Sequence, residues 1–190
     1  MLPSILYPEA KIEVARHGRE QQPVLVIDDI LDDPDRWRSE AAGAAYGRIG
    51  AHYPGIRAPV DPAAGGRMRD ELAGVIGDTF GLHPAPPVFE CYILVVMTRP
   101  QSLAPIQRLP HVDGLEPERI AILIYLSGAE MGGTAFYRQR ATGFETLDAD
   151  RYRTFEAALK ADVARYGLPP PSYIAGDTDI YERLAGYEAR

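Results

Sequence analysis

The spacing of hydrophobic positions predicts two long amphipathic helices. Between residues 67 and 81, apolar side chains recur at the period of one helix face, and Gly81 can end the helix. This stripe comprises Met68, Leu72, Val75, Ile76 and Phe80. Between Asp148 and Gly167 a second stripe has the same period and comprises Tyr152, Phe155, Leu159, Val163 and Tyr166. We interpret the second helix as an amphipathic cover.

A strand followed by a shorter helix is predicted nearer the N-terminus. The β-branched apolar run 23–27 is typical of a strand. Asp33 and Pro34 then supply an N-cap residue and a proline at the first helical position. The helix that follows would turn Trp37 and Ala41 inward and end near residue 43.

Later apolar runs predict further strands. The run 88–97 has the length and β-branching of a strand that is buried on both faces. Two more strands are predicted at 119–126 and 134–138, a loop at 46–66, and a polar, helix-like stretch at 181–190.

This order of elements favours an α+β protein with a mainly β core. Helices outside closely spaced strands fit a double-stranded β-helix, or jelly roll, better than they fit alternating βαβ units. The chain of 190 residues is predicted to form one domain, 1–190. Only about five strands can be placed, whereas a jelly roll has about eight, so the core is predicted to be incomplete at its C-terminal end.

The net charge and the lengths of the apolar runs argue against nucleic-acid and membrane partners. The formal net charge is −7, with acidic and basic residues interspersed, so no basic face is predicted for nucleic acid or an anionic membrane surface. No apolar run is long enough to cross a bilayer, and the N-terminus does not match a signal peptide. We therefore expect a cytoplasmic protein. Its single cysteine, Cys91, is expected to be a buried small hydrophobe.

Chemistry is concentrated in the segment 107–117. Side chains alternate along a strand, so His111 and Asp113 would point to one side and could converge on a metal ion. An imidazole and a carboxylate suit Fe(II), and a second histidine would complete the two-His-one-carboxylate set that leaves positions open for a cosubstrate and O₂. The alternative is an ordinary hydrogen-bonded pair of side chains.

Several segments resemble a family of 2-oxoglutarate/Fe(II) oxygenase-like proteins, and more distantly the prolyl-hydroxylase-type oxygenases. They are LPHVDG, AILIYLSG, GGTAFYRQRATGFE, HYPGIRAPV and SYIAGDTDIYERL. The resemblance implies a double-stranded β-helix and Fe(II) held by His111 and Asp113. It also implies oxidative decarboxylation of the cosubstrate 2-oxoglutarate, coupled to hydroxylation of a small-molecule or peptidyl substrate.

The same resemblance suggests roles for other residues. Tyr125 matches the tyrosine that contacts the distal carboxylate of 2-oxoglutarate, and Thr134 follows the glycine turn into the strand that faces the site. A core aromatic is the alternative role of Tyr125. Tyr53, Arg57 and Arg138 are candidates for the substrate mouth, because arginine recognises carboxylates and tyrosine gives a rigid contact.

The sequence lacks one expected metal ligand. No histidine follows His111, and His17, His52 and His83 all precede it, whereas the family's distal histidine comes later. Three explanations are open: a chain that stops before the last strands, which we favour; a substitute ligand, Asp177 or Asp179; or a non-catalytic jelly-roll binding module that has lost the metal site.

Overall fold

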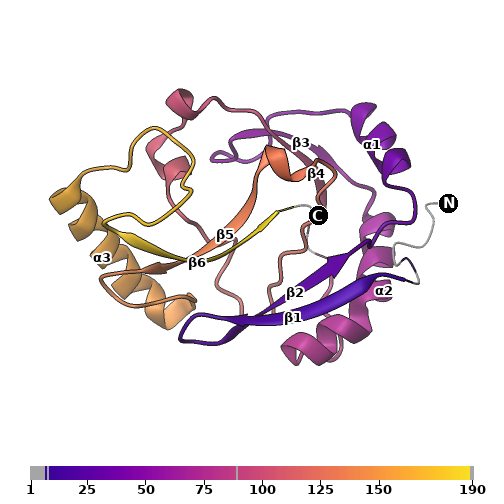
Figure 1. The fold of residues 1–190 in the computed structure, drawn as a ribbon, viewed down its shortest axis with the longest axis horizontal. Coiled ribbons are helices and arrows are strands. Elements are labelled where there is room, and N and C mark those ends of the chain that lie inside the picture. Colours follow the sequence, from indigo (N-terminus) through magenta and orange to yellow (C-terminus); the bar gives the residue numbers. More distant parts are fainter. Residues whose placement is uncertain (1–6, 8, 89, 189–190) are drawn as a thin grey trace. The chain divides into compact units, whose positions relative to one another are not determined.

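The computed structural model describes residue 7, residues 9–88 and residues 90–188, and the chain divides into two units (Figure 1). Unit 1 consists of Met1–Arg16 and Pro23–Met97, and unit 2 of His17–Gln22 and Thr98–Arg190. Phe89, which belongs to the predicted strand 88–97, and residues 189–190 of the predicted helix-like stretch lie outside the described residues.

Unit 1 contains two helices and four strands. In chain order they are β1 (Lys11–His17), β2 (Gln22–Asp28), α1 (Pro34–Ala42), β3 (Gly55–Pro59), α2 (Pro62–Phe80) and β4 (Tyr92–Val96). The strands form two two-stranded ribbons, β1–β2 and β3–β4, and the second is antiparallel. The turn between β1 and β2 groups with unit 2.

Both helices of unit 1 begin at an Asp-Pro pair. Asp33 caps α1 by accepting a hydrogen bond from the backbone N–H of Arg36 at 2.9 Å. Asp61 caps α2 in the same way, so this helix starts five residues before the predicted Arg67, inside the predicted loop. The helix ends at Gly81, as predicted.

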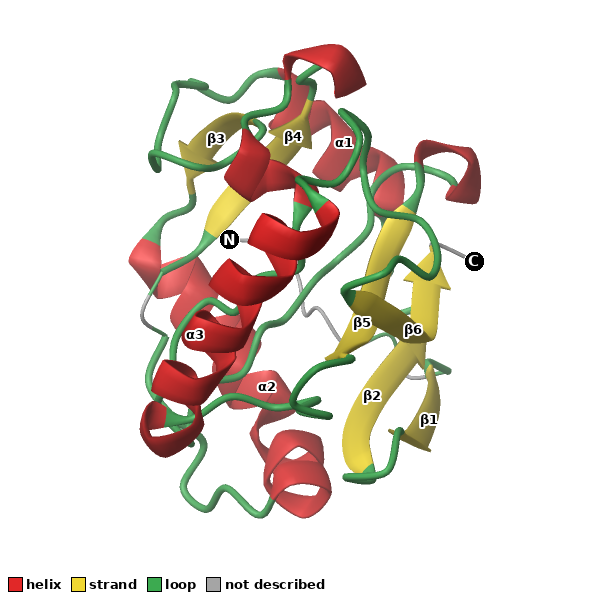
Figure 2. Ribbon diagram, turned by 90° about the vertical axis from the view of Figure 1, so that its left-hand side faces the viewer, coloured by secondary structure: helices red, strands yellow, loops and turns green. Residues whose placement is uncertain are grey.

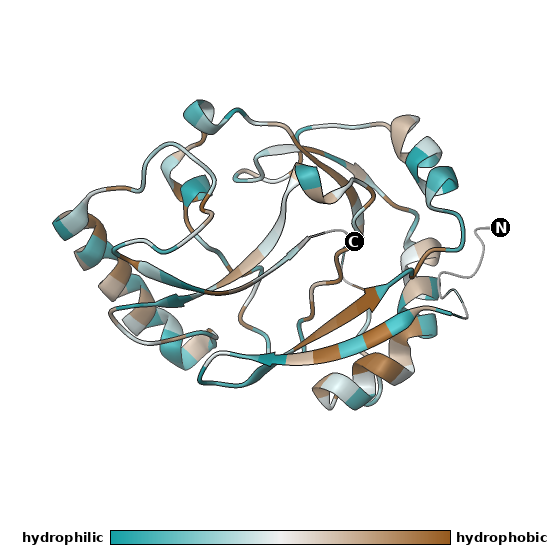
Figure 3. Cartoon of the chain, in the orientation of Figure 1, coloured by the Kyte–Doolittle hydropathy of each residue, from teal (hydrophilic) through white to brown (hydrophobic). Residues whose placement is uncertain are grey.

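The predicted apolar faces of these helices are confirmed. Trp37 and Ala41 are the partly buried positions of α1. In α2, Leu72 and Ile76 are buried, with the rest of the predicted stripe partly buried around them. Figure 3 shows brown, hydrophobic segments along α2 and along β2.

The β3–β4 ribbon depends on a close approach of two backbones. Gly55 lies opposite Val96, and a Cβ atom on Gly55 would come within 1.9 Å of the Val95 carbonyl oxygen. No rotation of a side chain can relieve a contact with backbone, so this position requires glycine.

Unit 2 contains one two-stranded ribbon and one α-helix, and long loops make up much of the rest (Figure 2). Its regular elements are β5 (Gly133–Gln139), α3 (Ala149–Tyr166) and β6 (Tyr181–Glu188), with short 3₁₀ turns at Pro100–Ser102, Pro105–Arg108 and Ala129–Met131. Asp148 caps α3, because its carboxylate accepts a hydrogen bond from the Arg151 backbone N–H at 2.8 Å.

The core of unit 2 lies between α3 and the β5–β6 ribbon. Leu109, Ile180 and Tyr181 are buried there. The partly buried residues that pack against them are Tyr137, Phe155, Leu159, Val163 and Ile174. The middle of the predicted α3 stripe therefore covers this core, as predicted, while Tyr152 and Tyr166 at its ends are exposed.

The predicted jelly roll, with its mainly β core, is wrong. The described residues form three two-stranded sheets and three α-helices, with no large or closed sheet. Sequence alternation and apolar runs identify residues that can be extended, but they do not specify how many neighbours a strand has.

Individual strand predictions had mixed outcomes. The predicted strands 23–27 and 134–138 lie within β2 and β5. Residues 119–126 form no strand, and the run 88–97 contributes only β4, whose Leu94, Val95 and Val96 are exposed instead of buried on both faces. A two-stranded ribbon has too few neighbours to cover both faces of such a strand.

The helix-like stretch at 181–190 is also corrected, because its described part is β6. β6 pairs antiparallel with β5, with a register shift between Phe136 and Tyr137. Within the described part of the chain, none of the helices is both long and apolar enough to cross a membrane.

We predict that Gly55→Ala lowers the free energy of unfolding by about 3 kcal/mol, because the new Cβ would overlap the Val95 backbone. Gly74→Ala is a matched control, since its Cβ would meet nothing within 4 Å and the helix would gain about 0.5–1 kcal/mol. Urea denaturation measures both values, and equal effects would contradict the close approach of β3 and β4.

A second prediction concerns Tyr181. Burial, reinforced by the charge of Asp162, raises the pKa of Tyr181 to about 12. Its hydroxyl has no hydrogen-bond partner among the described residues. Because the pKa of the unfolded tyrosine is about 10, this group contributes its full stability below about pH 10. That contribution is lost as the pH rises through about 12.

Tyr181→Phe should therefore keep the neutral-pH stability within about 0.5 kcal/mol or raise it, because it removes a buried hydroxyl without a partner. It should also reduce the loss of stability between about pH 10 and 12. Chemical denaturation at several alkaline pH values tests this, with the exposed Tyr152→Phe as control. A large loss of stability at pH 7 would show that the hydroxyl has a partner.

Candidate functional site

His111 and Asp113 lie in an exposed loop of unit 2. The loop follows the 3₁₀ turn Pro105–Arg108 and is anchored by the buried Leu109. The side chains of His111 and Asp113 are 79% and 61% exposed, and the His111 Nε2 atom is 3.7 Å from the Asp113 Oδ1 atom. The prediction that the two residues lie on a strand is wrong, because residues 111–113 have no regular structure. The loop nevertheless brings their side chains close together.

The chemistry of this pair fits a shared divalent metal ion. Metal bonds to histidine nitrogen and carboxylate oxygen are about 2.1 Å long, so two such bonds can span up to about 4.2 Å. The 3.7 Å separation is within that span. The described residues contain no group of three or more His, Cys, Asp or Glu side chains that could hold a metal. The pair thus offers two ligands.

The carboxylate of Glu116, three residues after Asp113, pairs with an arginine. Glu116 accepts a hydrogen bond from Arg119 Nε at 2.7 Å, and this contact lowers the pKa of Glu116 to about 2. Arg119 and Glu116 also occupy the space beside Gly114, where a Cβ atom would meet both side chains. The Arg119–Glu116 pair therefore lies beside Gly114, the residue after Asp113, a contact that sequence reasoning missed.

The two predicted cofactor-binding residues are in contact. Tyr125 donates a hydrogen bond from its hydroxyl to Thr134 Oγ1 at 2.6 Å. Thr134 lies in β5, while Tyr125 lies in the segment without regular structure that precedes it. Both side chains are half-buried. A hydroxyl carries one proton and two lone pairs, so Thr134 keeps its own proton for a further acceptor.

The three predicted substrate residues fall into two groups. In unit 1, the guanidinium carbon of Arg57 lies 4.2 Å from the centre of the Tyr53 ring, a cation–π contact. In unit 2, Arg138 is buried and its guanidinium binds Glu145 and Glu182. Arg138 thus already contacts two carboxylates of its own chain.

Glu145 is the centre of a buried polar network in unit 2. Its side chain is only 2% exposed and accepts hydrogen bonds from the backbone N–H groups of Arg19 and Glu20 at 3.0 and 2.9 Å, as well as from Arg138. Burial is the largest single influence and alone would raise the pKa of Glu145. The hydrogen bonds and the Arg138 charge together bring it below its usual value.

Two of the other histidines and one of the late aspartates have other contacts. His17 Nε2 forms a short hydrogen bond with the Tyr187 hydroxyl, and His83 Nε2 lies 3.7 Å from Asp78 Oδ1. Asp177, one of the substitute ligands considered, binds Arg140 at 3.0 Å and accepts a hydrogen bond from the Arg183 backbone N–H.

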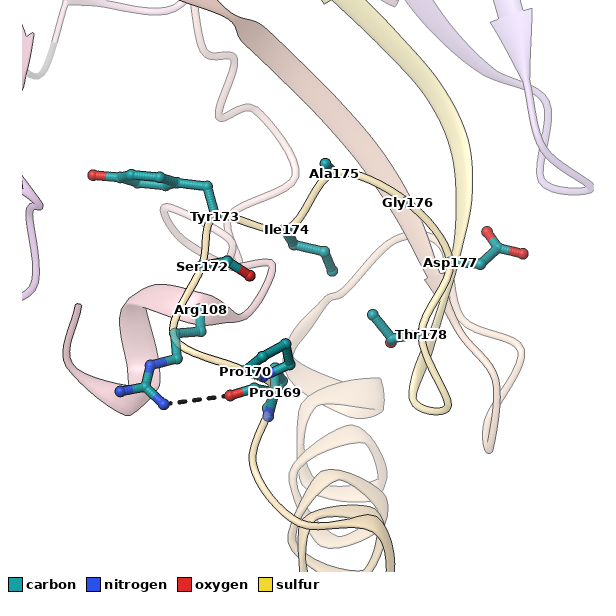
Figure 4. Close-up of a pocket in the computed structure, with 10 residues that line it drawn as sticks. All are labelled: Arg108, Pro169, Pro170, Ser172, Tyr173, Ile174, Ala175, Gly176, Asp177 and Thr178. Carbon is teal, nitrogen blue, oxygen red and sulfur yellow. Dashed lines mark hydrogen bonds between the residues drawn. The ribbon is translucent and has the colours of Figure 1, made fainter. Parts of the chain in front are cut away.

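A pocket of about 190 Å³ lies beside the loop 169–178 (Figure 4). Arg108 lines it and donates hydrogen bonds to the backbone carbonyls of Leu103 and Pro169, which holds the loop in place. In Figure 4 the Tyr173 ring and the Asp177 carboxylate point away from the other lining side chains. Among the predicted site residues, only Asp177, which was considered as a substitute metal ligand, lines this pocket.

Comparison with known protein families matches residues 8–190 to a family described as a family of unknown function, DUF6445. The chain belongs to this family. No curated protein and no solved structure matches the chain. The match to DUF6445 spans both units. Because the function of this family is unknown, the arguments about chemistry rest on the side chains of the chain itself.

For this DUF6445 member we predict that Glu145→Gln lowers the melting temperature at pH 7, because it removes the charge that Arg138 and two backbone N–H groups bind. A carboxyl with a lowered pKa stabilises the fold above its unfolded value of about 4.3. That stability is lost as the pH falls through the native value, so the variant should show a weaker dependence of stability on acid pH.

Melting curves between pH 7 and pH 3 measure this dependence. Glu156→Gln is the control, because Glu156 forms an exposed ion pair with Lys160 on α3 and such pairs contribute little. Parallel acid profiles for wild type and Glu145→Gln would contradict the assigned role of Glu145.

Proposed function

We propose that the protein is an Fe(II)- and 2-oxoglutarate-dependent oxygenase in which His111 and Asp113 hold the iron. The observation that carries the proposal is the 3.7 Å separation of the two side chains, which suits one shared ion, in a motif that resembles the oxygenases. The exposure of the pair leaves the other coordination positions accessible to ligands.

Tyr125 and Thr134 would act together in cosubstrate binding. Because the Tyr125 hydroxyl donates a hydrogen bond to Thr134 Oγ1, the Thr134 hydroxyl proton can point to a carboxylate oxygen of 2-oxoglutarate. Tyr125 would then position Thr134. When bound, the iron and 2-oxoglutarate would supply the oxidising chemistry for hydroxylation of a small-molecule or peptidyl substrate, while the protein orients the reactants.

The first test is turnover of 2-oxoglutarate. With Fe(II), O₂ and 2-oxoglutarate, we expect wild-type protein to form succinate even without substrate, and His111→Ala and Asp113→Asn to lower the rate at least tenfold, because each removes one of two ligands. Succinate is measured directly. Wild-type formation no faster than that of His111→Ala would contradict the proposal.

A matched control is present in the same chain. His83 and Asp78 show the same 3.7 Å separation, so His83→Ala removes an exposed imidazole with an equivalent carboxylate neighbour. This variant should keep wild-type turnover. Equal losses in His83→Ala and His111→Ala would indicate non-specific metal binding.

Thermal stability separates the oxygenase from a non-catalytic binding module. A ligand that binds only the folded state raises the melting temperature. The oxygenase should therefore be stabilised by Mn(II) and 2-oxoglutarate together, in a manner that requires His111. A module that has lost the metal site would show no change.

A further inference from the structure

The guanidinium of Arg57 in unit 1 contacts two aromatic rings, and among the described residues it forms no ion pair with a carboxylate. Its guanidinium carbon lies 4.2 Å from the ring centre of Tyr53 and 5.4 Å from that of Tyr92. Its Nε atom is buried and has no hydrogen-bond acceptor among the described residues. Arg138 in unit 2, by contrast, contacts two carboxylates. Arg57 is therefore a partly buried cation whose donors are not used up by the described protein groups.

Strand geometry explains how these side chains meet. Tyr53 lies two residues before β3, and Arg57 lies in the middle of that strand, with its guanidinium over the Tyr53 ring. Arg57 lies opposite Leu94 in the antiparallel register, which makes Tyr92 its diagonal neighbour on the same face. The backbone of Arg57 also forms hydrogen bonds with Gly47 at 2.9 Å in both directions, so the strand is held on both edges.

A glycine lies beside the guanidinium of Arg57. Gly50 has a φ of +84°, and a Cβ atom at this position would lie only 3.3 Å from Arg57 Nη1. Any side chain at residue 50 would therefore crowd Arg57 Nη1, and glycine avoids this contact. The rings of Tyr53 and Tyr92 lie near the planar group, while hydrogen-bond acceptors must approach a guanidinium in its plane.

We propose that Arg57, with Tyr53 and Tyr92, forms a binding site for the carboxylate group of a small ligand. A carboxylate accepts two parallel hydrogen bonds from one guanidinium. At Arg57 these bonds would come from the two Nη groups, because Nε is buried. The rings of Tyr53 and Tyr92 beside the planar guanidinium favour a planar acceptor such as a carboxylate over tetrahedral phosphate. This site lies in unit 1 and is independent of the proposed metal pair in unit 2.

The test is an NMR titration of metal-free protein with two carboxylates, succinate and N-acetylglycine, and with inorganic phosphate at equal ionic strength. The Arg57 Nε–H signal reports changes in the guanidinium that would form the proposed contact. We expect both carboxylates to shift this signal saturably, and phosphate to bind at least tenfold more weakly. Tighter binding of succinate would indicate a free dicarboxylate as ligand, and tighter binding of N-acetylglycine a peptide C-terminus.

Variants of Arg57 separate binding from folding. Arg57→Gln should weaken carboxylate binding about tenfold or more, because a charge-assisted hydrogen bond is lost. Arg57→Lys keeps the charge but not the paired donors, and should weaken binding as well. Arg165→Gln is the matched control, since Arg165 also lies over a tyrosine ring, at 5.0 Å from that of Tyr166, and the variant loses the same charge.

Several results would overturn the proposal. They are no saturable shift with either carboxylate, equal binding of phosphate, or unchanged carboxylate binding in Arg57→Lys. Because binding is measured without metal, a failure here leaves the turnover test of His111 unaffected, and a failure of turnover leaves this site unaffected. Far-UV circular dichroism confirms that each variant is folded before titration.

Discussion

Every sheet in the described residues has only two strands, and this constraint shapes the rest of the structure. An isolated two-stranded ribbon is marginally stable in water, because its faces and outer edges are open. Each ribbon must therefore gain stability from groups outside its own ladder. β3 does so through the backbone pairing of Gly47 with Arg57, and the β5–β6 ribbon through the apolar side chains of α3.

In unit 2 the buried carboxylate of Glu145 provides a second kind of support. It joins the turn between β1 and β2, through the N–H groups of Arg19 and Glu20, to Arg138 of β5. Arg138 in turn binds Glu182, its cross-strand partner in β6. Burying a carboxylate is costly unless its hydrogen bonds are satisfied, and here backbone and side-chain donors satisfy them together.

The candidate site residues differ from this stabilising network in their exposure and contacts. His111 and Asp113 are exposed on a loop and contact each other, while Tyr125 and Thr134 are half-buried and hydrogen-bonded. The exposed side chains can contact a ligand, whereas the buried Arg138 already forms an ion pair with Glu145. Arg57 is intermediate, because it is partly buried but its Nε lacks an acceptor among the described residues.

The sequence by itself determined the features that depend on neighbours along the chain. Asp33 and Asp148 cap the predicted helices, Gly81 ends α2, and His111 approaches Asp113 two residues away. Capping, helical periodicity and short loops act over a few residues, so local patterns report them.

Only the tertiary structure decided which segments pair. The apolar run 119–126 forms no strand, whereas the polar stretch after Ile180 becomes β6 because β5 offers it a partner. The contact of Arg57 with Tyr92 likewise requires the β3–β4 register, and the pairing of Glu145 with the turn at Glu20 joins residues far apart in sequence. A strand or an ion pair exists only when its distant partner is in place, and no local pattern specifies that partner.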